Sequence, residues 1–137
     1  DVIILDGDQV IYNPDILSPH FENSGYNCVW TEKHTQEWLL SVKEDVVCSC
    51  SRSGGEKGWQ LFSVSRWTAE DGQRLKRHLE FEFEEKHNRQ IFWDEIALFC
   101  YPDQYRLGIY EMQAGDIVEI DSFEELAVID THYKLKI

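Results

Sequence analysis

The sequence predicts an α/β domain with a mixed β-sheet and flanking helices. Short segments rich in aliphatic and aromatic residues alternate with longer amphipathic segments, and turn-forming residues separate the two kinds. The 137 residues are 42% hydrophobic and 13% aromatic, which is the composition of a globular chain with one core. No internal repeat, low-complexity segment or linker divides the chain, so we expect one domain over residues 1–137.

The strands are predicted from apolar runs and from alternation of apolar and polar residues. The first run, residues 2–5, is entirely aliphatic and is expected to be buried on both faces. Residues 9–13 continue extended, and residues 53–58 are expected to form a flexible loop. The expected strands are residues 2–5, 26–32, 37–42, 45–51, 59–67, 104–112 and 116–121.

The helices are predicted from caps and from apolar residues at helical spacing. Thr68 is a suitable N-cap for the longest helix, which carries one apolar stripe and one charged face. The glutamate-rich residues 80–86 are expected to lie on its solvated face. Ser122 opens the last helix with a capping box. The expected helices are residues 69–87, 91–100 and 123–133, and the segment 14–21 is expected to form one or two helical turns that end at Pro19.

The charge of the chain excludes some partners. There are 26 acidic residues against 13 Lys and Arg, a formal net charge of −13. This balance argues against nucleic acid or an anionic membrane as a partner, and it is compatible with a cationic ligand or a metal. The apolar runs are far shorter than a membrane span. The four cysteines match no zinc-site spacing, so we expect reduced, mostly buried thiols in a cytoplasmic protein.

Two predicted strands end in acidic residues. Asp6 and Asp8 follow the first strand, and Glu119 and Asp121 end the segment 116–121. In open α/β sheets ligands bind beyond the carboxyl ends of strands, so these carboxylates could meet at one divalent cation. Mg²⁺ prefers one or two carboxylates together with phosphate oxygens and water. The alternative is that Asp8 and Asp121 only shape turns or caps.

A second candidate site combines tryptophans with carboxylates. Glu37 and Trp38 lie in one segment, and Phe92, Trp93 and Asp94 lie in another. An aromatic ring beside a carboxylate is a good receptor for a quaternary ammonium group, because the ring face attracts the cation. The alternative is that the tryptophans belong to the core. No glycine-rich phosphate loop and no nucleophile–histidine pair is evident in the sequence.

Together these motifs resemble one family. The segments "ILDGDQVI", "QEWLLSV", "GWQLFSVSRW", "FWDEI" and "IVEIDSFEEL" occur in the order found in bacterial phosphocholine cytidylyltransferases, which belong to the nucleotidyltransferase superfamily. The resemblance extends over almost the whole chain. It implies the C-terminal, acceptor-binding part of a Rossmann-like nucleotide-diphospho-sugar transferase domain. The half that binds the nucleotide in that family is not expected within residues 1–137.

The resemblance implies a role for each candidate residue. Asp8 and Asp121 would hold Mg²⁺, which would bridge the phosphates of CTP and phosphocholine. The choline group would lie among the residues of the second candidate site and the acid before Asp121, namely Glu37, Trp38, Phe92, Trp93, Asp94 and Glu119. The family usually has tyrosine at the position of Phe92. Ser122 would be a helix cap, and Asp6 would only shape a turn.

The implied reaction is nucleotidyl transfer from CTP to phosphocholine, giving CDP-choline and pyrophosphate. Phosphoethanolamine is an alternative acceptor, because a smaller ammonium group could use the same acids. A sugar-1-phosphate nucleotidyltransferase and a non-catalytic module that binds choline-type ligands remain alternative functions. We expect the isolated chain to be inactive. A truncated parallel sheet would leave an unpaired edge near residues 2–5, which predicts self-association.

Overall fold

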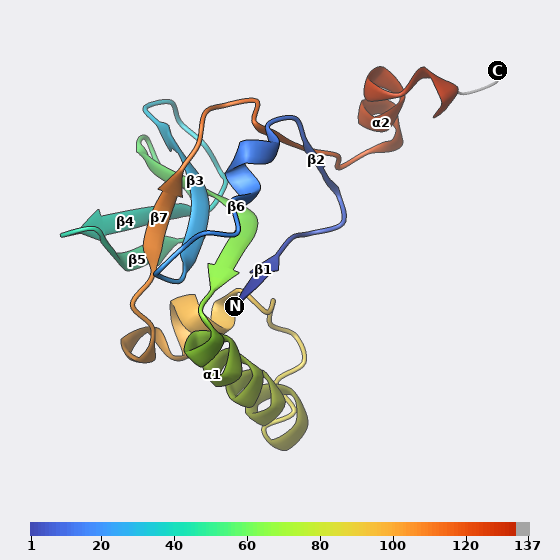
Figure 1. The fold of residues 1–137 in the computed structure, drawn as a ribbon. Helices are drawn as coiled ribbons and strands as arrows, with labels where there is room; N and C mark the ends of the chain where they lie inside the picture. The colour runs from blue at the N-terminus through green and yellow to red at the C-terminus, as the bar shows by residue number, and fades with distance from the viewer. Residues whose placement is uncertain (134–137) are drawn as a thin grey trace.

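The structure, a computed structural model, describes residues 1–133 (Figure 1). Its two helices are α1 (Ala69–Glu80) and α2 (Phe123–Ile129). The strands are β1 (Val2–Ile4), β2 (Gln9–Ile11), β3 (Gly25–Thr31), β4 (Leu39–Lys43), β5 (Val46–Ser51), β6 (Gly58–Trp67), β7 (Gly108–Glu111) and β8 (Ile117–Glu119). Single helical turns are η1 (Pro14–Leu17), η2 (Phe81–Glu85), η3 (Ile96–Cys100), η4 (Pro102–Gln104) and η5 (Thr131–Tyr133).

The predicted fold class, a mixed sheet with flanking helices, is confirmed. The main sheet has the strand order β5-β4-β6-β3-β7, and β1 pairs with the end of β6. A separate ladder joins β2 to β8. Among the strand pairs in residues 1–133, β3 and β7 are parallel and the others are antiparallel. The expectation of a parallel sheet around the first strand was therefore wrong.

The first strand is also less buried than its composition predicts. Val2 is 45% exposed and Leu5 is 42% exposed. The reason is that β1 pairs only with the end of β6, where Val2 lies opposite Trp67. The other edge of β1 has no strand partner in the described part of the chain. Self-association through this edge stays a prediction.

Strand β6 separates two apolar clusters, one on each face of the sheet. Leu61 and Trp67 belong to the larger cluster, which α1 and η3 cover (Figure 1). Phe62 and Val64 face the smaller cluster, which includes residues of η1 and β8. Because side chains alternate across a strand, the sequence "LFSVSRW" supplies both faces from one segment.

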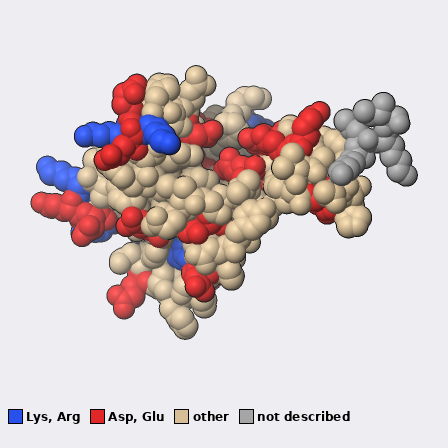
Figure 2. Space-filling view, turned by 90° about the horizontal axis from the view of Figure 1, so that it is seen from above, with Lys and Arg blue, Asp and Glu red and all other residues tan. Residues whose placement is uncertain are grey.

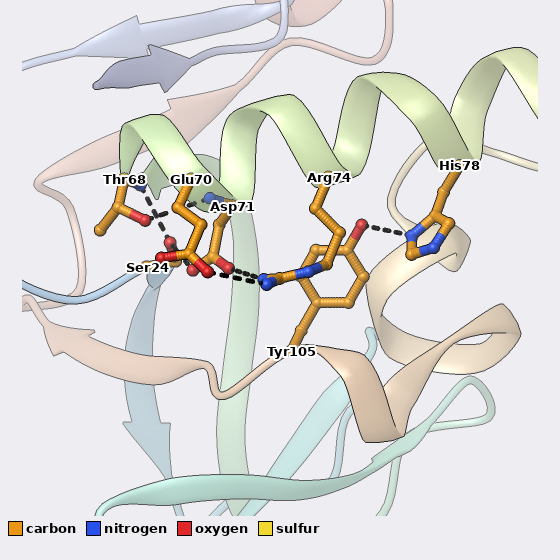
Figure 3. A network of polar contacts seen from close by, with 7 residues as sticks. All are labelled: Ser24, Thr68, Glu70, Asp71, Arg74, His78 and Tyr105. Atoms are coloured by element: carbon orange, nitrogen blue, oxygen red, sulfur yellow. Dashed lines mark hydrogen bonds and ion pairs between the residues drawn. The ribbon is translucent and has the colours of Figure 1, made fainter.

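Partly buried polar contacts attach α1 to the segments that precede β3 and β7 (Figure 3). The hydroxyl of Ser24 donates to Asp71 at 2.6 Å and accepts from the backbone N–H of Thr68 at 3.0 Å. One turn from the other end, Nδ1 of His78 lies 2.7 Å from the hydroxyl of Tyr105. The N-cap role predicted for Thr68 is confirmed, since its Oγ1 accepts from the N–H of Asp71.

Three predicted helices are shorter than expected. The longest, predicted over residues 69–87, is α1 followed by the wider turn η2. The segment 91–100 forms a helical turn only from Ile96 to Cys100. The helix predicted over residues 123–133 ends at Ile129, because Asp130 is extended.

The glutamate-rich end of the long helix is not wholly solvated, which corrects that expectation. Glu82 is 2% exposed. Its carboxylate accepts hydrogen bonds from Asn88 at 3.0 Å, from Tyr101 at 2.8 Å and from Lys86 at 3.0 Å. The bond from Asn88 is the largest of the contributions that lower the pKa of Glu82. Burial of this charge is tolerated because donors satisfy both oxygens.

The cysteines are all free: Cys28 is buried, Cys50 and Cys100 are partly buried, and Cys48 is exposed. No helix within residues 1–133 is long and apolar enough to cross a bilayer.

Gly25 allows β3 and β7 to approach each other closely. A Cβ atom there would lie 2.3 Å from the backbone oxygen of Gly108. We expect Gly25→Ala to lower the free energy of unfolding by about 2 kcal/mol or more, measured by urea denaturation. Gly72→Ala is the matched control. Gly72 lies within α1, and a Cβ atom there would have its nearest neighbour, Cγ1 of Val2, at 3.8 Å. This substitution should stabilise the protein by about 0.5–1 kcal/mol, and equal effects of the two variants would contradict the close approach.

Candidate active site

A pocket of about 260 Å³ opens between the β2–β8 ladder and the main sheet. Its most distinctive feature is that five carboxylates line it and that no lysine or arginine within residues 1–133 does so. The remaining walls are two aromatic rings, one leucine and one serine. The lining residues are Asp6, Asp8, Glu37, Trp38, Leu61, Ser63, Phe92, Asp94 and Glu119.

The two acidic strand ends lie side by side. Gln9 and Glu119 are opposite each other in the β2–β8 ladder, and the N–H of Ile120 donates to the carbonyl oxygen of Asp8 at 2.8 Å. Antiparallel pairing of these segments therefore brings Asp8 and Glu119 to the same pocket. These residues come from segments more than a hundred positions apart in the chain.

Asp121 lies next to this group but is not among the residues that line the pocket. Its backbone N–H donates to the Glu125 carboxylate at 2.6 Å, and the hydroxyl of Ser122 accepts from the N–H of Glu125 at 3.2 Å. The predicted N-cap role of Ser122 is thus confirmed, but the Glu125 side chain bonds back to the N–H of Asp121 and not to that of Ser122, which a standard capping box would require. Ser122 acts as a cap, and the negative charge of Asp121 contributes to the raised pKa of Glu119.

Electrostatics show how closely the acids are grouped. Burial raises the pKa of Glu119, and the negative charge of Glu37 raises it further. Asp121 and Asp8 add smaller contributions of the same sign. Because like charges disfavour ionisation only at short range, these acids belong to one electrostatic group. A cation that enters the pocket would relieve their repulsion.

The aromatic wall comes from two segments. The ring of Trp38 meets Phe92 edge to face at 6.4 Å between centroids and Phe99 at 5.6 Å. Phe92 is 69% exposed, so its ring is free to meet a ligand. Trp93, by contrast, lies in the core, stacked at 6.5 Å on Tyr26 and at 6.2 Å from Trp67, and is not among the pocket-lining residues.

The arrangement around Trp93 corrects the expected helix. Residues 92–95 form a turn in which the N–H of Glu95 donates to the carbonyl oxygen of Phe92 at 3.0 Å. This turn directs Phe92 and Asp94 to the pocket and Trp93 to the core.

Asp94 is the most strongly perturbed acid of the pocket. It is 8% exposed, and the hydroxyl of Tyr26 donates to its Oδ1 at 3.0 Å. Burial raises the pKa of Asp94 to about 6, although the hydrogen bond from Tyr26 opposes this shift. This value already includes smaller contributions of the same sign as burial from the negative charges of Asp6 and Glu95.

Three lining residues were not expected from the sequence. Asp6 was interpreted as a turn residue, yet it lines the pocket with Asp8. Leu61 and Ser63 come from β6, where the alternation of side chains placed them on one face without indicating that this face opens to a ligand. Its position at the end of the first strand, two residues before Asp8, makes Asp6 a candidate, but the resemblance implies only a turn role for it.

The lining residues fit a hard divalent cation. The donors are carboxylates with one hydroxyl and no histidine or cysteine, a set that suits Mg²⁺ better than zinc. Within residues 1–133, no three His, Cys, Asp or Glu side chains already converge as metal ligands. A site with one or two carboxylates, completed by phosphate oxygens and water, remains compatible with Asp8 and its neighbours.

Comparison with known proteins shows what this chain is similar to. No family model matches the chain. Over 130 residues it is 28% identical to a 2-aminoethylphosphonate cytidylyltransferase from Lancefieldella rimae, covering 95% of this chain and 52% of that protein. The resemblance to cytidylyltransferases is confirmed.

Solved structures show the same fold. The CTP:phosphocholine cytidylyltransferase of Streptococcus pneumoniae superposes with a TM-score of 0.75 at 20% identity, over 96% of this chain and 57% of that one. The inositol-1-phosphate CTP transferase of T. maritima gives a TM-score of 0.57 at 12% identity, over 96% of this chain and 52% of that one. The chain thus has the nucleotidyltransferase fold and spans about half the length of these cytidylyltransferases.

The raised pKa of Asp94 allows the cost of burying its charge in this pocket to be measured. Since its pKa is raised from 3.8 to about 6, the native state binds more protons than the unfolded state between these values. Stability contributed by the neutral form is therefore lost as pH rises through about 6. We expect Asp94→Asn, which still accepts from Tyr26, to raise the free energy of unfolding near neutral pH by about 1–3 kcal/mol.

The gain should disappear below about pH 4, where both side chains are neutral. Urea denaturation across this pH range measures it. Asp103→Asn is the control, because Asp103 is exposed and distant from this pocket. A gain that does not change with pH would contradict the raised pKa.

Proposed function

We propose that this chain supplies the acceptor half of a CTP-dependent cytidylyltransferase. The acceptor would carry a cationic amine and a phosphate or phosphonate group. The observation that carries the proposal is the pocket, in which five carboxylates and two aromatic rings converge and to which the described part of the chain contributes no basic side chain. Such a pocket attracts a cationic group, and none of its lining residues within 1–133 carries a positive charge that would repel that group.

The reaction would be nucleotidyl transfer. A phosphate oxygen of the acceptor attacks the α-phosphorus of CTP, the new P–O bond forms, and the bond to pyrophosphate breaks. No general base is required, because the acceptor phosphate is already an anionic nucleophile at neutral pH. Asp8 and Asp121 are the proposed holders of Mg²⁺, which when bound would offset negative charge on the phosphates. The chain's own contribution is to bind and orient the acceptor.

Phosphocholine is the first proposed acceptor. The rings of Trp38 and Phe92 are available as faces for a trimethylammonium group, and Glu37 supplies a countercharge beside them. The solved relative from Streptococcus pneumoniae, whose described substrate is phosphocholine, supports this choice through its fold.

A primary amine is the second candidate, and the position of Trp93 favours it. Because Trp93 packs on Tyr26 in the core, the aromatic wall contains only two rings. A primary ammonium group donates hydrogen bonds that the surplus carboxylates can accept, whereas a trimethylammonium group has none to donate. The sequence relative from Lancefieldella rimae is a 2-aminoethylphosphonate cytidylyltransferase, which supports this alternative. Phosphoethanolamine has the same ammonium group.

A sugar phosphate fits the pocket less well. Sugar hydroxyls are recognised by several neutral donors and acceptors, but Ser63 is the only neutral polar side chain among the lining residues. A non-catalytic binding module would use the same pocket and differ only in turnover.

The acceptor is tested by titrating the chain with phosphocholine, 2-aminoethylphosphonate and glucose 1-phosphate in the presence of Mg²⁺, using calorimetry. We expect binding of at least one amine and no binding of the sugar phosphate. Trp38→Ala should weaken phosphocholine binding by about 5- to 30-fold, because a cation–π contact is lost. Glu37→Gln should instead weaken binding of the primary amine more than binding of phosphocholine. The reason is that a primary ammonium group donates hydrogen bonds to a carboxylate, whereas a trimethylammonium group has none to donate.

Trp30→Ala is the matched control, since Trp30 is exposed and packs on Trp59 outside the pocket. No binding of either amine would contradict the proposed acceptor pocket. Equal loss in Trp30→Ala and Trp38→Ala would contradict the aromatic wall.

The metal assignment is tested in the full-length protein. Asp8→Ala and Asp121→Ala should each lower kcat by about a hundredfold or more while the circular dichroism spectrum stays unchanged. Excess Mg²⁺ should restore part of the loss, because the remaining carboxylate can still contribute one ligand. Asp103→Ala is the control at an exposed acid away from the pocket. Near-normal turnover in both Asp variants would exclude them as metal ligands.

A further inference from the structure

Arg52 lies outside the pocket and contacts residues behind two of its walls, the wall formed by Trp38 and the turn that carries Phe92. Its guanidinium carbon lies 3.8 Å from the centroid of the Phe99 ring and 5.8 Å from that of Trp38. Its Nη1 lies 2.5 Å from Oε1 of Glu95, whose side chain is 6% exposed. Neither Arg52 nor Glu95 lines the pocket. Arg52 therefore connects the wall formed by Trp38 to the turn that carries Phe92.

Glu95 holds that turn closed with its second oxygen. Its Oε2 accepts the backbone N–H of Phe92 at 2.7 Å, while its own N–H donates to the carbonyl oxygen of Phe92 at 3.0 Å. The turn between them presents Phe92 and Asp94 to the pocket. Because the carboxylate of Glu95 is buried, it needs a cationic partner, and Arg52 supplies it.

The loop at residues 53–58, which follows Arg52 and was expected to be flexible, makes defined hydrogen bonds with its neighbours. Thr35 and Gly55 exchange two backbone hydrogen bonds of 3.0 Å, and the hydroxyl of Ser51 donates to the carbonyl oxygen of Gly54 at 2.8 Å. Gly54 has a φ of +75°, and a Cβ there would lie 1.9 Å from the oxygen of Thr35. The position of Arg52 is therefore set by backbone contacts.

We propose that Arg52 and Glu95 are positioning residues that hold Trp38 and Phe92 in the geometry that receives the amine of the acceptor. This inference rests on the proposed function for its substrate. Arg52 stacks on the Phe99 ring that supports Trp38, and Glu95 fixes the backbone of Phe92. Removing either partner releases one wall and leaves the other partner buried or unpaired.

A purely structural role is the competing explanation, and it makes a different prediction. A structural ion pair would change the free energy of unfolding and leave the affinity of the folded protein for its acceptor unchanged. Positioning predicts a loss of affinity in protein that is still fully folded. The two are separated by measuring acceptor binding well below the unfolding temperature.

The test uses Arg52→Met, which keeps the apolar stem and removes the charge, and Glu95→Gln, which keeps an acceptor for the N–H of Phe92. We expect each variant to bind phosphocholine or 2-aminoethylphosphonate at least about tenfold more weakly than the unmodified chain. The double variant should lose no more acceptor affinity than the single variant that binds more weakly, because the two residues act as one unit. Arg52→Lys should restore the pairing with Glu95 but only part of the affinity, since it cannot stack as a planar group.

Two ligand-free readouts keep the inference independent of the substrate. Amide hydrogen exchange at Phe92 should become at least about tenfold faster in Arg52→Met, and the indole N–H resonance of Trp38 should shift. Arg106→Met is the matched control at an exposed arginine outside this pocket. It should change neither readout.

The outcomes separate this inference from the proposed function. If the unmodified chain binds neither amine, the proposed acceptor is wrong, and the exchange at Phe92 and the resonance of Trp38 decide whether Arg52 holds the two walls. If the unmodified chain binds an amine and folded Arg52→Met binds it within twofold of the same affinity, the positioning role is overturned. Unchanged ligand-free readouts in Arg52→Met would overturn it as well.

Discussion

The pairing of β6 is the constraint on which the rest of the structure depends. One edge of this strand pairs with β3, and the other edge is shared by β4 and β1. Since its side chains alternate, the same strand supplies Val64 to the smaller cluster, Trp67 to the larger one, and Ser63 to the floor of the pocket. A slip of one residue in the pairing would exchange these faces and remove both the core and the pocket.

The hydrogen bond from Tyr26 to Asp94 connects the core to the pocket. Tyr26 is fully buried on β3 and meets Trp67 edge to face at 5.9 Å. Its hydroxyl is the polar end of an aromatic group that also includes Trp93. Aromatic packing thus fixes the position of the Asp94 carboxylate in the pocket wall. Burial at this position raises the pKa of Asp94. The aromatic group around Tyr26 therefore determines both the packing beside the pocket and the raised pKa of Asp94.

Local sequence patterns predicted most of the sheet but not the site in full. Strands β3, β5 and β6 lie within one residue of their predicted bounds, because alternation and turn residues are local signals. The turn at residues 92–95 was missed, because an apolar run is compatible with a helix, whereas the turn depends on the Glu95 side chain bonding back to Phe92. Asp6 was undervalued for a similar reason. Its exposure to the pocket depends on how β1 pairs with β6, which no local pattern reveals.

Charge balance determines what this pocket can accept. Acidic side chains are spread over the face seen in Figure 2, and the chain as a whole carries a formal charge of −13. Two like charges about 4 Å apart repel by about 1 kcal/mol in water and by about 4 kcal/mol near a protein surface. Arg52 does not relieve this repulsion, because its charge is already paired with Glu95. Protonation of Asp94 removes one charge only below about pH 6. Near neutral pH the repulsion between the carboxylates can therefore be relieved only by a bound cation. A metal ion and an amine would each neutralise carboxylates in a different part of the pocket. An anionic phosphate could then approach a site that would otherwise repel it, so the carboxylates proposed to bind a cationic acceptor would also make binding of its phosphate depend on cations.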